Sequence, residues 1–181
     1  IRIQVRRIVL IFFVLWPMSL HADLNFNYGS GVAAKTDYAE KSLITSMEKV
    51  GDRIYAVGVH GIIIFSDDNG DTWTRADYVP FQNTITDISC TSENMCWATG
   101  HDATILHSSD GGINWVKQYD DYDFDAPLLS IHMYDDKEGL AIGAFALSLR
   151  TSNGGESWDY LFLDDDDYQP HLNYVYGDNQ A

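Results

Sequence analysis

The sequence predicts an all-β fold, a β-propeller built of four-stranded blades. Two observations lead to this prediction. A unit of 42–43 residues recurs three times, and the pieces between its turns are short and rich in β-branched and aromatic residues. A repeat of this length fits either four short strands or two to three helices. No stretch after residue 50 keeps an apolar stripe over three helical turns, so the pattern favours strands. Units of four strands arranged around an axis form a propeller.

The repeat is defined by residues that recur with constant spacing. Each copy holds a glycine 15 residues before a tryptophan, in the pairs Gly58 and Trp73, Gly100 and Trp115, and Gly143 and Trp158. This spacing places blades at about residues 42–84, 85–128 and 129–171, with the start of a fourth at Leu172. Three blades and the opening of another do not close a ring. We therefore expect a fragment of a six- or seven-bladed propeller.

Each copy also carries a box with the pattern Ser/Thr-x-Asp/Asn-x-Gly-x-x-Trp. Its members are Ser66, Asp68, Gly70 and Trp73; Ser108, Asp110, Gly112 and Trp115; and Thr151, Asn153, Gly155 and Trp158. We interpret the box as a tight turn between the third and fourth strands, because glycine adopts positive φ there and the polar side chains bond back to turn amides. A catalytic or metal-binding role for Asp68 and Asp110 is the alternative, and Asn153 in the third copy argues against it.

Charge and the N-terminal segment indicate export. The chain has 27 acidic and 11 basic residues, a net charge of −16, which argues against nucleic-acid binding and against docking on an anionic membrane. Residues 1–22 combine three arginines with a short apolar run, as a signal peptide does. An uncleaved anchor is the alternative. We predict a lead-in over 23–41 and an exported mature protein, in the periplasm, that does not insert into the membrane.

The two cysteines, Cys90 and Cys96, are expected to form a structural disulfide. They fall at the end of one predicted strand and the start of the next, so they face each other across a hairpin. Facing residues of an antiparallel pair have Cα atoms about 4.5–5.5 Å apart, within disulfide range. Export to an oxidising compartment favours the bond.

The boxes match the Asp-box, or bacterial-neuraminidase (BNR), repeat. The wider units, such as Tyr55–Gly58 leading into the box at 66–73, resemble the photosystem II stability and assembly factor-like propellers. This resemblance covers residues 42–181. It implies a non-enzymatic, chaperone-like factor of the periplasm or of a compartment like the thylakoid lumen. Such a factor binds subunits of a membrane or periplasmic complex.

A sialidase-like or other glycoside hydrolase is the alternative, since sialidases also carry the box. Such a site resembles three arginines that clamp a carboxylate. After residue 22 the chain has only Arg53, Arg75 and Arg150, at three different places in the repeat. We expect them not to converge, and we predict no enzyme activity.

A partner is expected at the face formed by loops joining second to third strands and blade to blade, by analogy with other propellers. The candidate binding residues are His60, His101, Asp102, Phe145, Tyr122 and Phe124, with Tyr78, Phe81 and Tyr168 in the same loops. Aromatic side chains among carboxylates suit a protein with a basic surface. The alternatives are a solvated acidic rim and a calcium-stabilised module. No cofactor is predicted, and the Cys/His spacing supports no metal site.

Overall fold

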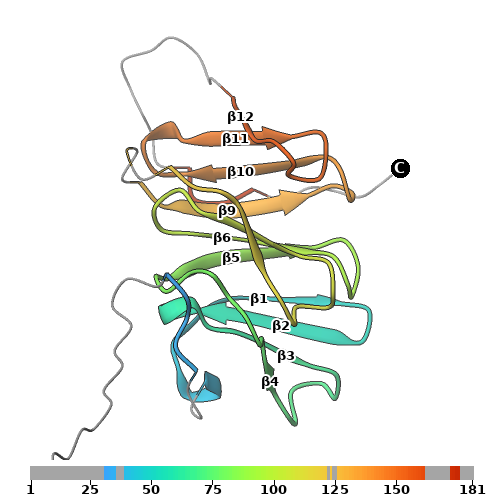
Figure 1. Ribbon diagram of the computed structural model, residues 1–181. Helices are drawn as coiled ribbons and strands as arrows, with labels where there is room; N and C mark the ends of the chain where they lie inside the picture. Colours follow the sequence, from blue (N-terminus) through green and yellow to red (C-terminus); the bar gives the residue numbers. More distant parts are fainter. Residues whose placement is uncertain (1–30, 36–38, 122, 124–125, 162–171, 176–181) are drawn as a thin grey trace, which may run out of the picture.

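The computed structural model describes residues 31–35, 39–121, 123, 126–161 and 172–175. Within these residues three four-stranded antiparallel sheets stack side by side (Figure 1). Helical structure in the described part is limited to three short 3-10 turns, η1 (Ala39–Lys41), η2 (Val59–Gly61) and η3 (Ala144–Ala146). No helix in this part has the length and apolarity to cross a membrane. The predicted all-β propeller of four-stranded blades is confirmed, while the predicted signal peptide lies outside the described residues.

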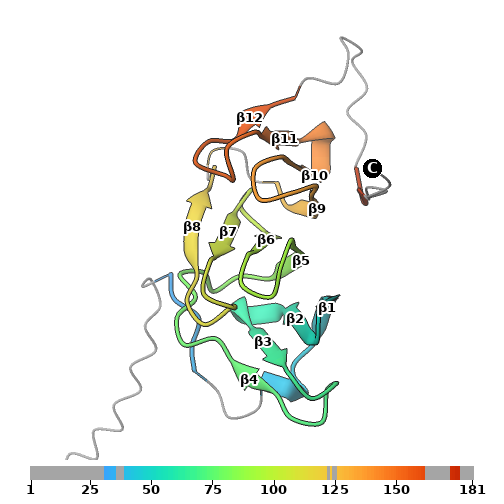
Figure 2. The ribbon, with the colours of Figure 1, turned by 90° about the vertical axis from the view of Figure 1, so that its right-hand side faces the viewer.

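Each blade is a meander whose strands pair in chain order. Blade 1 contains β1 (Ile44–Val50), β2 (Arg53–Gly58), β3 (Ile63–Ser66) and β4 (Thr74–Arg75); blade 2 contains β5 (Ile85–Cys90), β6 (Cys96–Gly100), β7 (Ile105–Ser108) and β8 (Val116–Tyr119); blade 3 contains β9 (Leu128–Met133), β10 (Gly139–Gly143), β11 (Ser148–Thr151) and β12 (Asp159–Tyr160). Figure 2 shows the first strands of the three blades along one side and the last strands along the other. We call β1, β5 and β9 the inner strands.

The same irregularity recurs in all three blades. The pairing of the inner strand with its neighbour shifts register next to Gly58, Gly100 and Gly143. Such bulges raise the local twist of a strand pair. A Cβ added at Gly58 would lie 2.1 Å from the Leu43 carbonyl oxygen, and one added at Gly143 would lie 2.2 Å from the Pro127 carbonyl oxygen. Both carbonyls come directly before an inner strand. The glycines at 42–43-residue spacing are therefore required by close packing of backbone against backbone.

The hydrophobic core lies between the blades. One cluster joins blade 1 residues such as Tyr55 and Ile63 to blade 2 residues such as Ile88 and Trp115. A second joins Trp97 and Ile105 of blade 2 to Ile131 and other residues of blade 3. Because every blade buries one face on the next, the stability of each sheet depends on its neighbours.

The inner strands are joined by polar contacts as well. Asp87 on β5 accepts hydrogen bonds from the Ser46 hydroxyl on β1 (2.7 Å), the Ser130 hydroxyl on β9 (2.8 Å) and the Ile131 amide (3.0 Å). Val175 repeats this pattern further along, since its amide donates to Ser130 Oγ at 3.2 Å. The segment 172–175 therefore lies against blade 3 much as β9 lies against blade 2.

Candidate functional site

The three box turns have the same internal hydrogen bonds. In blade 1 the Gly70 amide donates to Ser66 Oγ at 2.8 Å, and the Thr72 amide donates to Asp68 Oδ1 at 2.8 Å. The corresponding bonds in blades 2 and 3 join Gly112 to Ser108, Asn114 to Asp110, Gly155 to Thr151 and Ser157 to Asn153. The carboxylate and amide oxygens are thus occupied by their own turns, which is a structural use of these side chains.

Electrostatics at the boxes follows from these bonds. The hydrogen bonds from the hydroxyl and amide of Thr72 lower the pKa of Asp68 to about 2. Burial raises the pKa of Asp110, but bonds from Asn114 and Ser108 outweigh it, so the net shift is downward. A carboxylate held ionised in this way is poorly suited to act as a general acid near neutral pH. No group of three or more possible metal ligands occurs among the described residues.

Two of the three box tryptophans pack between neighbouring blades. Trp115 is fully buried against blade 1, and its indole N–H donates to the Gly112 carbonyl at 3.0 Å. Trp158 is 7% exposed and packs against blade 2. Trp73 has the same place on blade 1 but is only half-buried, beside Ala39, Ala56 and Ile64.

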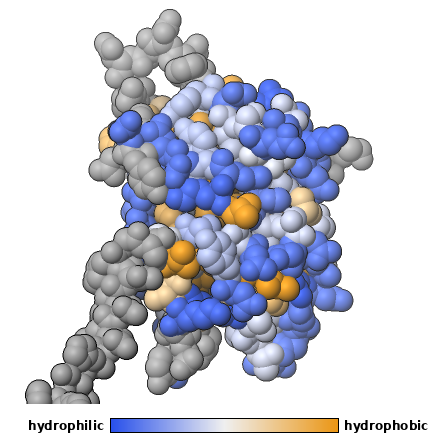
Figure 3. All heavy atoms as spheres, in the orientation of Figure 1, coloured by the Kyte–Doolittle hydropathy of each residue, from blue (hydrophilic) through white to orange (hydrophobic). Residues whose placement is uncertain are grey.

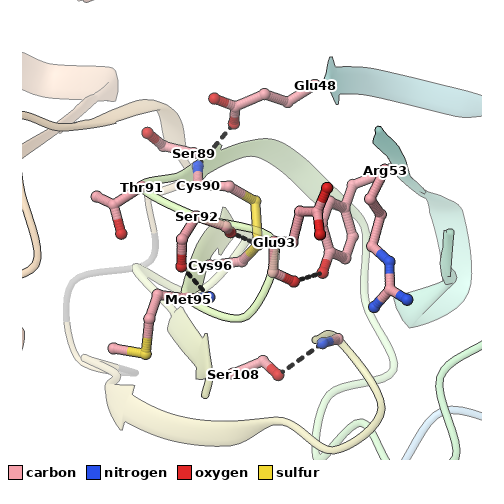
Figure 4. Close-up of a disulfide and its surroundings, with 12 residues drawn as sticks. Glu48, Arg53, Ser89, Cys90, Thr91, Ser92, Glu93, Met95, Cys96 and Ser108 are labelled. Atoms are coloured by element: carbon pink, nitrogen blue, oxygen red, sulfur yellow. Dashed lines mark hydrogen bonds between the residues drawn. A yellow bond between two sulfur atoms is a disulfide. The ribbon is translucent and has the colours of Figure 1, made fainter. Parts of the chain in front are cut away.

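Cys90 and Cys96 are bonded to each other across the β5–β6 hairpin, with their Cα atoms 4.1 Å apart (Figure 4). They form a register pair at the end of the two strands. The hairpin that they close contains Thr91–Met95, and its main chain is held by a bond from the Thr91 amide to the Met95 carbonyl at 3.0 Å.

Three equivalent turns lie at the opposite end of the sheets. The four-residue turns 59–62, 101–104 and 144–147 each close with a hydrogen bond from the last amide to the first carbonyl, at 3.1–3.2 Å. Both central residues of each turn have positive φ, as in a type I′ turn. The first central residues are His60 (59°), Asp102 (56°) and Phe145 (56°). We call this end of the blades the turn face.

The turn face brings together most of the predicted binding residues that the structure describes. His60 and His101 are exposed, Asp102 is partly exposed and Phe145 is 49% exposed. Asn83 connects two of the turns, because its carbonyl accepts from the Gly61 amide at 2.8 Å and its side chain donates to Asp102 at 2.6 Å. His60, Asp102 and Phe145 thus occupy the same position of the repeat on one shared face, with three different side chains.

Two of these turns carry more backbone strain than the third, in which only His60 has a Cβ at positive φ. Type I′ turns favour Asn-Gly, whereas Phe145-Ala146 and Asp102-Ala103 place residues with a Cβ at positive φ. Each such residue costs roughly 1 kcal/mol or more, most for a bulky side chain. Residues kept in a strained conformation are frequent at functional sites.

Several predicted residues lie elsewhere. The expectation that Phe81 faces a partner is wrong, because Phe81 is 4% exposed and belongs to the core between blades 1 and 2. Its ring fills the space beside Gly100, where no Cβ would fit. Tyr78 is exposed, but it pairs with Asn114 beside the box of blade 2. Tyr122, Phe124 and Tyr168 lie outside the described residues.

The three arginines after residue 22 do not form a cluster. Arg53 pairs with Asp67 at 2.6 Å, and Arg150 pairs with Glu138 at 2.9 Å. Arg75 lies on the last strand of blade 1, and burial lowers its pKa. They stand on β2, β11 and β4, so they do not form the convergent clamp of a sialidase.

Sequence reasoning missed the carboxylates on the inner strands. Glu48 lies between blades 1 and 2, where its Oε2 accepts from the Cys90 amide at 2.8 Å. Burial, together with the nearby charge of Asp87, raises its pKa to about 7, although the Cys90 amide opposes the shift. A signal for these polar contacts was present in the sequence. Polar residues, namely Ser46, Asp87 and Ser130, occupy the same repeat position, which pairs with the residue before the repeat glycine.

The outer surface shown in Figure 3 is mostly hydrophilic, with small and separate hydrophobic patches. This pattern suits recognition through polar groups and single apolar contacts better than through one broad apolar surface.

Comparison with known proteins identifies relatives over much of the chain. Residues 76–170 match the family described as photosynthesis system II assembly factor YCF48. A curated relative, the photosystem II assembly lipoprotein Ycf48 of Synechococcus sp. (strain CC9902), is 31% identical over 113 residues. That alignment covers 61% of this chain and 34% of the relative, so the chain spans about a third of the relative's length.

Solved structures show the same fold. YCF48 bound to D1 peptide superposes with a TM-score of 0.59 at 22% identity, covering 66% of this chain and 40% of that protein. YCF48 from Cyanidioschyzon merolae gives 0.56 at 21% identity, covering 66% and 37%. An ancestral GH74 enzyme gives 0.58 at 14% identity, covering 73% and 19%. At these identities the likeness concerns the fold alone.

Proposed function

Because the chain belongs to the photosynthesis system II assembly factor YCF48 family, we propose that it is an exported, non-enzymatic protein that binds a segment of another protein during assembly of a membrane-bound complex. The match of the family over residues 76–170 is the observation that carries this proposal. It spans blades 2 and 3, including both turns with strained residues.

The turn face is the proposed binding surface. Phe145 offers a ring that is half exposed, Asp102 offers a carboxylate, and His60 and His101 add imidazoles at the neighbouring turns. Tyr122 and Phe124 belong to the same proposal, since the sequence puts them in the loop that joins blades 2 and 3. A few anchors of this kind carry most of the energy of a protein interface.

Charge indicates the kind of segment that binds. The chain carries a net charge of −16. Asp121 lies beside the turn face, since its amide donates to the Asp102 carbonyl at 3.4 Å, and its side chain accepts from the Asp123 amide at 3.1 Å. The proposed partner segment therefore carries basic residues next to an apolar side chain, so that association is faster at low salt. One solved relative holds D1 peptide, which makes that peptide a suitable first probe for this chain.

A hydrolase is the less favoured function. The GH74 likeness is a likeness of fold, and fold by itself does not imply chemistry. The carboxylates of the boxes are held by their own turns, and the three arginines lie on separate strands. No observation in the described part of the chain favours glycoside hydrolysis.

Binding of labelled D1 peptide, measured by fluorescence anisotropy, tests the proposal. Phe145→Asn and Asp102→Asn each remove an anchor, while asparagine accepts the positive φ of these positions, so the turns stay intact. Each change is expected to weaken binding about tenfold, as loss of one anchor does. Glu156→Gln, in the box of blade 3 at the other end of the sheet, is the matched control. Equal affinity of all variants, or equal loss in the control, would contradict the proposed surface.

A further inference from the structure

The hairpin closed by Cys90 and Cys96 differs from its counterparts in the other blades. The corresponding register pairs are Lys49 and Ile54 in blade 1 and Met133 and Gly139 in blade 3. Both pairs keep the antiparallel ladder without a covalent link, and the chain has only two cysteines. The disulfide is therefore not needed to build this type of hairpin, so its effect must be sought in what this particular hairpin touches.

The hairpin contacts blade 1 at three points, and Figure 4 shows one of them beside the disulfide, the bond between the Cys90 amide and Glu48. The Tyr55 hydroxyl donates to the Glu93 carbonyl at 2.8 Å, and the Asp52 amide donates to Glu93 Oε1 at 2.7 Å. The Cys90 amide itself donates to Glu48. The β5–β6 hairpin of blade 2 is thus hydrogen-bonded to both β1 and β2 of blade 1.

The same hairpin also holds the box of its own blade and reaches blade 3. The Gly111 amide donates to the Asn94 carbonyl at 3.2 Å, and Arg53 of blade 1 donates to the Gly111 carbonyl at 2.7 Å. On the other side the Thr91 hydroxyl donates to Asp136. The position of the hairpin therefore influences both seams at this end of the molecule.

The disulfide is reachable from one side. Cys96 is fully buried, whereas Cys90 is partly exposed and Glu93 and Asn94 beside it are exposed. Cys90 packs against the edge of the core between blades 1 and 2. We therefore expect a small thiol reductant to attack the bond at Cys90 and not at Cys96.

We propose that the Cys90–Cys96 disulfide is a reducible restraint that sets how tightly the β5–β6 hairpin holds blade 1 and the box of blade 2. The reductant is a dithiol. Its thiolate attacks Cys90 Sγ to form a mixed disulfide, and Cys96 leaves as a thiolate and takes up a proton. The second thiol of the reductant then displaces Cys90, which is protonated in turn. Two electrons pass to the protein, and the reductant becomes a disulfide.

The expected effect follows from loop entropy. A bond closing a loop of about seven residues makes opening of the hairpin roughly fiftyfold less favourable in the chain-entropy estimate. Reduction removes this restraint while the hydrogen bonds remain. The Gly111 amide, bonded to the Asn94 carbonyl of the hairpin, is then expected to exchange about fiftyfold faster through local opening. The Asp52 amide, bonded to the exposed Glu93 side chain, is expected to exchange faster by a smaller factor. The Gly155 amide, bonded to Thr151 in the box of blade 3, is the internal reference.

The test treats the folded chain with dithiothreitol, without denaturant, and follows thiol alkylation and amide hydrogen exchange by mass spectrometry. We expect reduction at a rate that rises with dithiothreitol concentration, with faster exchange at Asp52 and Gly111 and little change at Gly155. The double variant Cys90→Ala and Cys96→Ala is expected to match the reduced protein with or without dithiothreitol. Glu93→Ala, which keeps the disulfide, is expected to speed hydrogen exchange of the Asp52 amide but not of the Gly111 amide.

Two results would overturn the proposal. In the first, the bond is reduced only at the rate of global unfolding, independent of dithiothreitol concentration. In the second, the reduced protein keeps the exchange rates of the oxidised protein at Asp52 and Gly111. Both results come from the unmodified sequence, so they hold even where the double variant does not fold.

Discussion

The carboxyl group of Glu48 makes the seam between blades 1 and 2 sensitive to pH. Its pKa is raised by burial from 4.5 to about 7, so the folded protein keeps this proton in a range where the unfolded chain has lost it. Stability from this group is complete below pH 4.5 and is lost as the pH rises through 7. Between pH 5 and pH 8 the loss is about 2–3 kcal/mol, at roughly 1.4 kcal/mol per pKa unit.

Glu48→Gln isolates this effect, because the amide oxygen still accepts from Cys90 but does not ionise. Burial lowers the pKa of His107 and His132, so their titration changes stability in the opposite direction over the same range. The histidines contribute equally to the pH dependence of both proteins, so their contribution cancels when the variant is compared with the parent. Urea unfolding at pH 5, 6, 7 and 8 is expected to show the variant gaining about 2–3 kcal/mol on the parent between the lowest and the highest pH. A difference that stays constant across the four pH values would refute the reasoning, and Glu156→Gln serves as the control for loss of a carboxylate.

Four further substitutions test other parts of the structure by urea unfolding. Trp115→Ala is expected to cost about 3–5 kcal/mol and Trp73→Ala clearly less, because only Trp115 is fully buried between two described blades. Equal costs would argue against the seam as the site of burial. Ala146→Gly is expected to stabilise the protein by about 1 kcal/mol through relief of positive φ, and a loss of stability would show that the turn is not strained. Asp110→Ala is expected to cost about 1–2 kcal/mol, because the Asn114 amide loses its acceptor; no change would remove the structural role of the box.

The sequence is informative where structure depends on residues close together in the chain. The box turn needs a hydroxyl, a carboxylate or amide oxygen and a glycine within five positions, and all three copies have them. The alternation of short apolar pieces with turn residues predicts the four strands of a blade in the same way. These features repeat with a fixed spacing, so each copy supports the interpretation of the others.

Contacts between blades were not predicted, because their partners lie about 40 residues apart or more. Glu48 meets Cys90, and Arg53 meets the Gly111 carbonyl, through the stacking of separate sheets. Burial of Phe81 has the same cause, since a loop residue in sequence becomes a core residue when the next blade covers it. The type I′ turn at Phe145 also contradicts local preference, because the tertiary structure imposes a conformation that the residues alone disfavour.

The arrangement of the core has a consequence for how such chains grow. Each blade presents one face to the blade before it and a different face to the blade after it, so the contact is head-to-tail. A gene segment that encodes one unit of about 42 residues thus encodes both complementary contact surfaces of a blade. Duplication of the segment adds a new interface between blades and leaves the existing interfaces unchanged. Individual copies are then able to diverge at their exposed turns, as His60, Asp102 and Phe145 have done, while the interfaces retain their shape.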